Sequence, residues 1–372
     1  MRRSKRWAEL EQLIRDEQGR GRCFAARDRN EVQLLRRHVA QSVVVEPFPR
    51  LFATNDYWNA LRPDARHLHI VRALAARDQD IVFCSHSAAL IHGLPVSYHL
   101  LDAVHCVTKA SAPSKSRGML KRHGRTPHEI TCVDGVRVIS LVEAAVDSMV
   151  SAPFADALAV ADGLLRTFDI DRDVLKFIVE ELAESRRGAA TARRAAAFAD
   201  GRAESGGESI ARAVMIEAGM APSDIQPAFS DPVELWREVR PDFLFLLKDG
   251  SAALGELDGL DKYDDPELTQ GRSTTEVLAR ERRRESHLTL LGMPVVRFSL
   301  HDVLTSGRLV YLLSVGGVTP STLAPGDYRA TGDGRPKKLL TSPLQTCTWL
   351  KRLLQTCMPF YAIRSIFLRL IA

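Results

Sequence analysis

The chain has 372 residues, of which 45% are hydrophobic and 26% charged, and its formal net charge is +5. This composition is that of a soluble globular protein with two or three domains. Its six cysteines show no CxxC pair or metal-type spacing, no apolar stretch follows the basic N-terminus, and no run of about 18 apolar residues exists. These features exclude a cysteine-rich zinc protein, a signal peptide and a spanning helix, and we expect a cytoplasmic protein with reduced thiols.

Residues 1–60 have the pattern of a small DNA-binding unit. Apolar residues recur at helical spacing from Trp7 to Glu17, and residues 24–38 are expected to form two further short helices. An apolar hairpin follows over residues 43–52. This order is typical of a winged helix-turn-helix, whose second helix can enter a major groove. A small helical capping domain would give the same pattern, so both interpretations stay open.

Residues 61–200 are predicted to form a mixed α/β region. A helix capped by Ser85 follows a short strand at 81–83, and Asp134-Gly135 is a hairpin turn signal. We expect His86 and His92 to be packing or capping residues. The remaining predicted elements are a helix over 67–76, a strand over 103–108, a hairpin over 131–139, and helices over 141–149, 155–165 and 169–207. The Gly206-Gly207 pair marks the domain boundary.

A basic segment lies at 109–125, with six Lys or Arg residues and no acid. Such a segment is either a solvated face or a set of phosphate contacts. The candidate DNA-binding residues are Lys109, Lys115, Arg117, Lys121 and Arg122.

The stretch 240–263 is predicted to form a β-hairpin. Two runs rich in Phe and Leu flank the turn signal 248–250, in which Gly250 can adopt a positive φ. A three-residue loop places Leu247 opposite Ser251, and counting back from the turn places Asp242 opposite Glu256.

Three carboxylates thereby gather on one face of an apolar hairpin. Strand alternation puts Glu256 and Asp258 on the same face, near Asp242, and Lys262 follows just beyond. Because unpaired charges are costly in apolar surroundings, the pattern predicts a divalent cation, Mg²⁺ or Mn²⁺, bound by Asp242, Glu256 and Asp258.

Two predicted helices present polar residues towards this face. Glu208 lies in the first turn of a helix over 208–218, where an acid also suits the helix dipole. In the helix over 276–291, Glu281 and Arg284 fall in the middle of the apolar stripe. One interpretation is that the two form an ion pair within the stripe. The other is that both point at the acidic face, with Arg284 as its positive partner.

The last segment, residues 316–372, differs from the body of the chain. It begins with a linker rich in Gly, Pro, Thr and Ser, and residues 337–372 hold six Lys or Arg and no acid. The basic part is either a segment that lies on a membrane surface or an extension without a role.

The order helix, strand, hairpin, helix, strand over 208–299, with Pro241-Asp242 and Glu256-Leu257-Asp258, resembles the PD-(D/E)xK nuclease superfamily. The motifs Gly255–Gly259, Lys262-Tyr263 and Glu281–Glu285 look more closely like the very-short-patch-repair-related endonuclease-like domain of actinobacterial proteins. Phe83–Pro95 and the strand, basic loop and strand that follow are similar to the AbiEi-type antitoxin region that often precedes that domain. The resemblance spans residues 5–313.

The resemblance implies roles for individual residues. Asp242 and Glu256 match the metal-binding acids of the nuclease family, and Glu208 matches the acid of its first helix. Mg²⁺ in such a site activates a water and neutralises charge on the scissile phosphate. Asp258 stands where the family pattern has Lys, so Lys262 would orient the water and Arg284 would steady phosphate or acid.

The expected fold class is α/β, α+β overall: a winged-helix-like region (1–60), an AbiEi-like α/β region (61–200), a restriction-endonuclease-like α-β-β-β-α-β core (201–315) and a tail (316–372). The first functional hypothesis is a Mg²⁺-dependent DNA endonuclease, a hydrolase. The alternative is an AbiEi-type antitoxin or transcriptional regulator that binds DNA and a toxin partner, with an inactive nuclease-like domain. A third is an ion-pair network of the acids with Arg240, Lys262 and Arg284, without catalysis.

Overall fold

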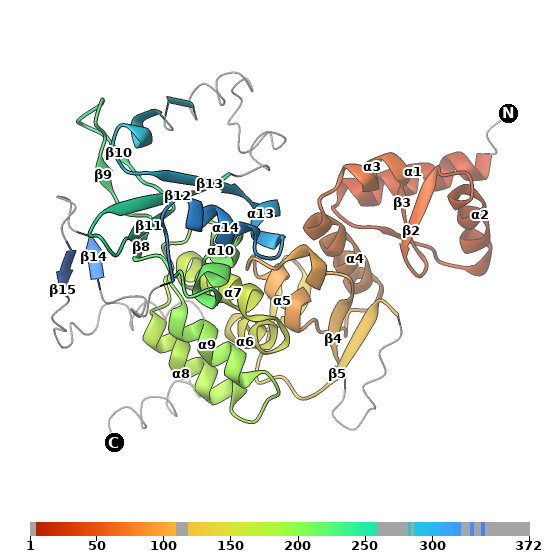
Figure 1. The fold of residues 1–372 in the computed structure, drawn as a ribbon. Coiled ribbons are helices and arrows are strands. Elements are labelled where there is room, and N and C mark those ends of the chain that lie inside the picture. Colours follow the sequence, from red (N-terminus) through yellow and green to blue (C-terminus); the bar gives the residue numbers. More distant parts are fainter. Residues whose placement is uncertain are drawn as a thin grey trace.

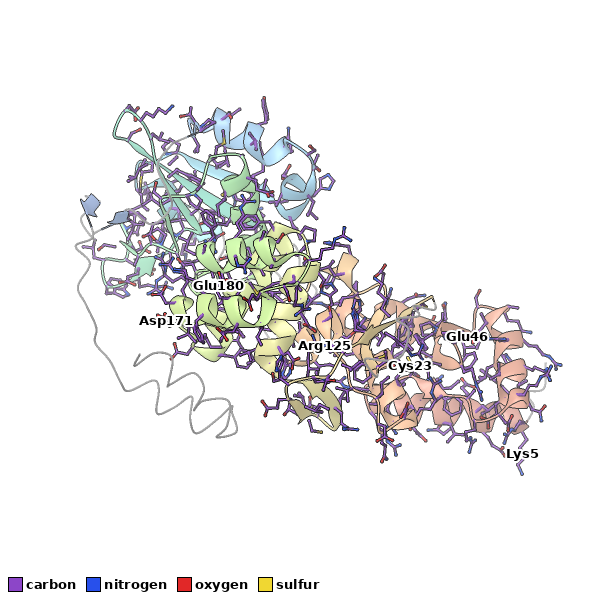
Figure 2. All side chains as sticks on the ribbon, turned by 90° about the horizontal axis from the view of Figure 1, so that it is seen from below. Lys5, Cys23, Glu46, Arg125, Asp171 and Glu180 are labelled. Atoms are coloured by element: carbon purple, nitrogen blue, oxygen red, sulfur yellow. The ribbon has the colours of Figure 1, made fainter. Side chains whose placement is uncertain are left out.

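The computed structural model describes residues 5–108, 118–258, 282–283, 286–320, 328–330 and 336–338. The chain is a mixed α/β protein, α+β overall, with several small sheets. It is elongated: Lys5 and Glu46 lie near one end, Asp171 and Glu180 lie in the other half, and Arg125 lies between them (Figures 1 and 2). Within the described residues, no helix has the length and apolar character needed to cross a bilayer. Six predicted site residues fall outside the described ranges: Lys109, Lys115, Arg117, Lys262, Glu281 and Arg284.

The N-terminal unit is a three-stranded sheet covered by two helices. Its elements are α1 (Lys5–Gly19), β1 (Phe24–Ala25), α2 (Arg29–Val39), β2 (Val44–Phe48) and β3 (Leu51–Thr54), and the strand order is β1-β3-β2. The prediction of two helices over 24–38 is wrong. Phe24 and Ala25 pair with β3, and Asp28 caps a single helix by accepting a hydrogen bond from the Glu31 backbone N–H at 2.9 Å.

The next region packs helices on short strands. It contains α3 (Asn55–Ala60), α4 (Pro63–Arg77), α5 (Ser85–Ile91), η1 (Tyr98–Leu100), β4 (Val104–Thr108), β5 (Leu120–Gly124), β6 (Ile130–Val133) and β7 (Val136–Ile139). The β6–β7 hairpin turns at Asp134 and Gly135, both with positive φ, as predicted. Residues 81–83 form no strand; Phe83 only bridges Cys106 and Val138. Ser85 is the first helical residue, with Cys84 at the N-cap, so its predicted capping role is wrong.

Four helices then form an alanine-rich layer: α6 (Leu141–Ser151), α7 (Phe154–Phe168), α8 (Arg172–Ala183) and α9 (Ala189–Phe198). Helix α10 (Gly206–Glu217) packs on α7, and Arg212 on α10 forms a buried ion pair with Asp162 on α7 at 2.7 Å. The predicted boundary between the regions 61–200 and 201–315, marked by Gly206-Gly207, stays a prediction. Helices α7 and α10, from either side of it, pack closely against each other.

The C-terminal region is built on a four-stranded sheet in the order β13-β12-β11-β8. Phe243, Phe245 and Phe298 pack with α10 and two later helices, whereas Leu254 and Leu288 pack together, and strand alternation places Leu254 on the opposite face. Strand β13 runs parallel to β12, and β11 is antiparallel to β12. The elements are β8 (Asp224–Ile225), β9 (Phe229–Ser230), β10 (Glu238–Val239), β11 (Phe243–Leu246), β12 (Ala252–Asp258), β13 (Val295–Ser299), α13 (Leu300–Leu304), α14 (Arg308–Val315), β14 (Tyr328–Ala330) and β15 (Pro336–Lys338).

Candidate functional site

The central hairpin has the register that its sequence predicts. Gly250 has φ +85°, and the Leu247 backbone N–H donates to the Ser251 carbonyl at 2.8 Å. Phe243 pairs with Gly255, so Asp242 precedes β11 at the level of Glu256 on β12. The sequence therefore located two acids correctly relative to each other.

Three carboxylates of this region are buried. Glu208 near the start of α10 is 8% exposed, Asp242 before β11 is 9% exposed, and Glu256 on β12 is 6% exposed. Burying a carboxylate removes its hydration, so each of these groups needs hydrogen-bond donors or positive charge nearby.

The side chain of Gln226 links two of the acids. Its Nε2 donates to Glu208 Oε2 and to Asp242 Oδ1, both at 3.1 Å. Gln226 follows β8 with φ +49°, and its backbone N–H donates to the Asp242 carbonyl at 3.0 Å, which holds the side chain in place. Asp242 Oδ2 accepts the Leu257 backbone N–H at 2.8 Å. One amide thus lies between two like charges, next to the strand that carries Glu256.

Glu208 combines a capping position with a site position. Ser205 is the N-cap of α10, and its hydroxyl donates to Glu208 Oε1 at 2.8 Å, while the Glu204 backbone N–H donates to Oε2 at 2.8 Å. Burial and the negative charge of Asp242 raise the pKa of Glu208, against the lowering effect of these hydrogen bonds. Stabilisation of the ionised form is therefore incomplete at this position.

Asp258 has a different environment. Its Oδ1 accepts from Arg297 Nε at 3.0 Å and also from Arg297 Nη2, and its side chain is 42% exposed. Arg297 lies on β13, in register with Glu256, so the parallel strand brings a cation to the face that carries both acids. Asp258 is therefore half of an ion pair with Arg297 in this arrangement.

The predicted metal set is not assembled as a ready ligand group. Among the described residues, no group of three or more His, Cys, Asp or Glu side chains has metal-binding geometry. The donor set of Glu208, Asp242 and Glu256 consists of carboxylate oxygens, which suit Mg²⁺ or Mn²⁺, whereas the contact of Asp258 with Arg297 does not fit a ligand role. Lys262 and Arg284 lie outside the described residues.

The two described members of the predicted basic surface do not share a face. Lys121 and Arg122 are consecutive on β5, so their side chains point to opposite sides of the strand. Lys121 Nζ lies 3.9 Å from Asp102 Oδ1, and Arg122 is exposed. Strand β5 also lies far from β12 in the fold (Figure 1).

Sequence reasoning missed Gln226 and Arg297. Alternation could have placed Arg297 correctly, because Val296 and Phe298 are buried on the helix-covered face and Arg297 must point the other way. No pattern distinguishes Gln226. Sequence reasoning also missed a buried pair in which His287 Nδ1 and Asp231 Oδ2 are 2.7 Å apart.

No family model matches the chain, and no solved structure matches it. The chain is similar to two proteins of Mycobacterium tuberculosis: uncharacterized protein MT2308 of strain CDC 1551 / Oshkosh and uncharacterized protein Rv2248 of strain ATCC 25618 / H37Rv. Each is 31% identical over 157 residues, which are 42% of this chain and 56% of the relative. The matched part thus spans little more than half the length of these curated relatives.

Proposed function

We propose that the C-terminal region is a divalent-cation-dependent nuclease domain that hydrolyses phosphodiester bonds in DNA. The observation that carries this proposal is the pair of buried carboxylates, Glu208 and Asp242, that accept hydrogen bonds from the one amide of Gln226. Like charges held this close are stabilised by a divalent cation far more than by a neutral amide.

Glu208, Asp242 and Glu256 would hold the cation, and the resemblance to PD-(D/E)xK nucleases supports that assignment. When bound, Mg²⁺ lowers the pKa of a water and neutralises charge on a phosphate. The residues of the chain position these groups: the Leu257 backbone N–H fixes one Asp242 oxygen, and Ser205 fixes one oxygen of Glu208.

The Asp258–Arg297 pair would contribute to phosphate binding on the same face. Arg297 is a bidentate donor suited to phosphate oxygens, and Asp258 holds its guanidinium at the end of β12. Lys262 and Arg284, which the resemblance assigns to water and phosphate, remain predictions. A phosphate that binds Arg297 would compete with Asp258 for the same donors.

Nicking of supercoiled plasmid tests this proposal. Wild-type protein with Mg²⁺ or Mn²⁺ should nick the plasmid, EDTA should stop the reaction, and Asp242→Ala and Glu256→Ala should each lose activity by at least about a hundredfold. Asp249→Ala is the matched control, because Asp249 is an exposed acid in the turn of the same hairpin. Equal nicking by wild type and both site variants would overturn the proposal, as would no nicking by wild type.

A second candidate, the DNA-binding regulator with a toxin partner, draws support from the N-terminal unit. Two helices there accompany a three-stranded sheet in the order β1-β3-β2, an arrangement compatible with a winged helix. This candidate predicts salt-sensitive binding to the promoter DNA of its own gene that survives Asp242→Ala. Replacing the exposed Arg29 and Arg37 of α2 by Gln should weaken that binding; unchanged affinity would exclude α2 from the DNA contact.

A further inference from the structure

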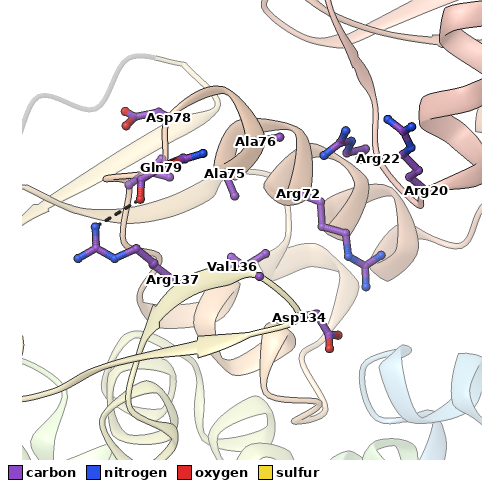
Figure 3. Close-up of a pocket in the computed structure, with 12 residues that line it drawn as sticks. Arg20, Arg22, Arg72, Ala75, Ala76, Asp78, Gln79, Asp134, Val136 and Arg137 are labelled. Atoms are coloured by element: carbon purple, nitrogen blue, oxygen red, sulfur yellow. Dashed lines mark hydrogen bonds between the residues drawn. The ribbon is translucent and has the colours of Figure 1, made fainter.

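A pocket of about 730 Å³ lies between the N-terminal unit and the region that follows it. The turn after α1, the last part of α4 and the β6–β7 hairpin form its walls (Figure 3). Arginines face it from each of these elements: Arg20 and Arg22 from the turn, Arg72 from α4 and Arg137 from β7. The acids that line it are Asp78 and Asp134, so the lining carries an excess of positive charge.

The four arginines differ in how their charge is compensated. Arg20 and Arg22 both donate to Glu17, so a single negative charge compensates two guanidinium groups. Arg137 lies 3.4 Å from Asp80, an acid whose side chain is fully exposed and therefore strongly screened.

Arg72 is the least compensated of the set. Its Nη1 donates to the carbonyl of Gly21 at 3.3 Å, and within the described parts of the chain no carboxylate lies within ion-pair distance. Gly21 has φ +68°, and a Cβ at that position would come within 3.0 Å of Arg72 Nη1. The glycine thus lets the backbone approach the guanidinium closely, and the Arg72 side chain extends from α4 on the side of Asp134 (Figure 3).

The size and the lining of the pocket limit the kinds of ligand that it can bind. Small-molecule sites typically enclose about 300–1,000 Å³ and are lined by apolar groups with a few placed polar ones. Here Ala75, Ile81 and Val136 supply the apolar floor between the arginines, and Asp78 and Asp134 offer acceptors for amino or hydroxyl groups.

We propose that this pocket binds a phosphate ester of nucleotide size, with the phosphate at Arg72. Guanidinium forks match the oxygens of phosphate, and a phosphate beside Arg72 would gain a charge-assisted contact that this arginine otherwise makes only to a carbonyl. The phosphate belongs either to a free nucleotide or to a nucleic-acid strand. The site is separate from the carboxylate cluster and does not depend on the proposed nuclease activity.

Calorimetry on the full-length protein tests the proposal with inorganic phosphate, adenosine monophosphate, adenosine, a four-nucleotide single strand and a 20-base-pair duplex. Adenosine monophosphate or the single strand should bind more tightly than adenosine, and Arg72→Gln should weaken that binding at least about tenfold. Arg77→Gln, on an exposed residue of the same helix outside the pocket, should leave it within about twofold. Stronger binding of the mononucleotide assigns the site to free nucleotides, and stronger binding of the single strand assigns it to nucleic acid.

A second variant keeps the test valid if Arg72→Gln unfolds. Ala76→Glu adds a carboxylate at an exposed position of α4 that lines the pocket, and it should weaken phosphate binding without loss of helix stability. Equal affinity for adenosine and its monophosphate, affinity unchanged in Arg72→Gln and Ala76→Glu, or no binding of any phosphate ligand would each overturn the proposal. The comparison of adenosine monophosphate with adenosine, carried out in EDTA, does not involve the carboxylate cluster, so failure of the nuclease proposal leaves this test intact.

Discussion

Replacing Glu208 by Gln should stabilise the protein at neutral pH, although Glu208 is buried and hydrogen-bonded. The Gln side chain can keep every contact of the Glu. Its Oε1 can accept from the Glu204 backbone N–H and from Gln226, and its Nε2 can donate to Ser205 Oγ once that hydroxyl rotates. The substitution therefore removes a charge without removing a hydrogen bond.

The size of the effect follows from the two carboxylates. Glu208 and Asp242 each accept from Gln226 Nε2 at 3.1 Å, which places those oxygens no more than about 6 Å apart and implies a repulsion of about 1–3 kcal/mol. Loss of the favourable interaction of an acid with the start of α10 costs about 0.3–1 kcal/mol. We expect the free energy of unfolding to rise by about 1 kcal/mol.

The pH dependence of folding stability tests the same repulsion independently. The folded-state pKa of Glu208 is raised above its usual 4.5, so ionised Glu208 destabilises the fold at neutral pH, and the effect disappears as the pH falls through the raised pKa. Urea unfolding of wild type and Glu208→Gln in EDTA at a series of pH values measures this difference. The advantage of Glu208→Gln should be present at pH 7 and vanish towards pH 4.5.

Glu143→Gln is the matched control. Glu143 is also buried, but its Oε1 accepts from Arg125 at 2.6 Å, so its neutralisation should destabilise the protein by about 1–3 kcal/mol. A loss of stability in Glu208→Gln similar to that in Glu143→Gln would refute repulsion at Glu208 and leave only its role in the first turn of α10.

Three further predictions concern the scaffold. Arg212→Met should lower the free energy of urea unfolding by about 3–5 kcal/mol, because it leaves the buried Asp162 without its cation. Adding Asp162→Leu should restore most of the loss. A cost below about 1 kcal/mol would contradict a tight α7–α10 contact. Burial, followed by the charge of Lys121, lowers the pKa of His86 to about 4. The free energy of unfolding at pH above 6.5 should therefore fall by about 3 kcal/mol as the pH drops towards 4. An equally steep loss in His86→Asn would show that protonation of His86 does not cause it. Gly163→Ala should destabilise the protein despite the helix propensity of Ala, because the new Cβ would lie 2.2 Å from Pro95 Cδ. Gly19→Ala, where a Cβ would meet open space, should not. An unchanged thermal unfolding midpoint in Gly163→Ala would refute the clash.

The sequence predicted best where local geometry decides. The hairpin register depends on the positive φ of Gly250 and on strand alternation, so Asp242 and Glu256 could be placed relative to each other without the fold. The Asp134-Gly135 turn was located for the same reason.

Prediction was weakest where distant segments meet. The contact of Gln226 with Glu208 and Asp242 joins three segments, and the pairing of Asp258 with Arg297 requires the parallel register of β12 and β13. At the N-terminus, helical spacing over 24–38 was misleading because Phe24 and Ala25 gain strand partners in β3. Tertiary pairing decided both outcomes.

The central claim is that Glu208, Asp242 and Glu256 form a divalent-cation site. Calorimetric titration of the metal-free protein with Mn²⁺ tests it most directly. We expect one binding event in wild type, at least about tenfold weaker in Asp242→Asn and in Glu208→Gln, and unchanged in Asp249→Asn. Absence of Mn²⁺ binding by wild type, or equal affinity in all four proteins, would contradict the claim.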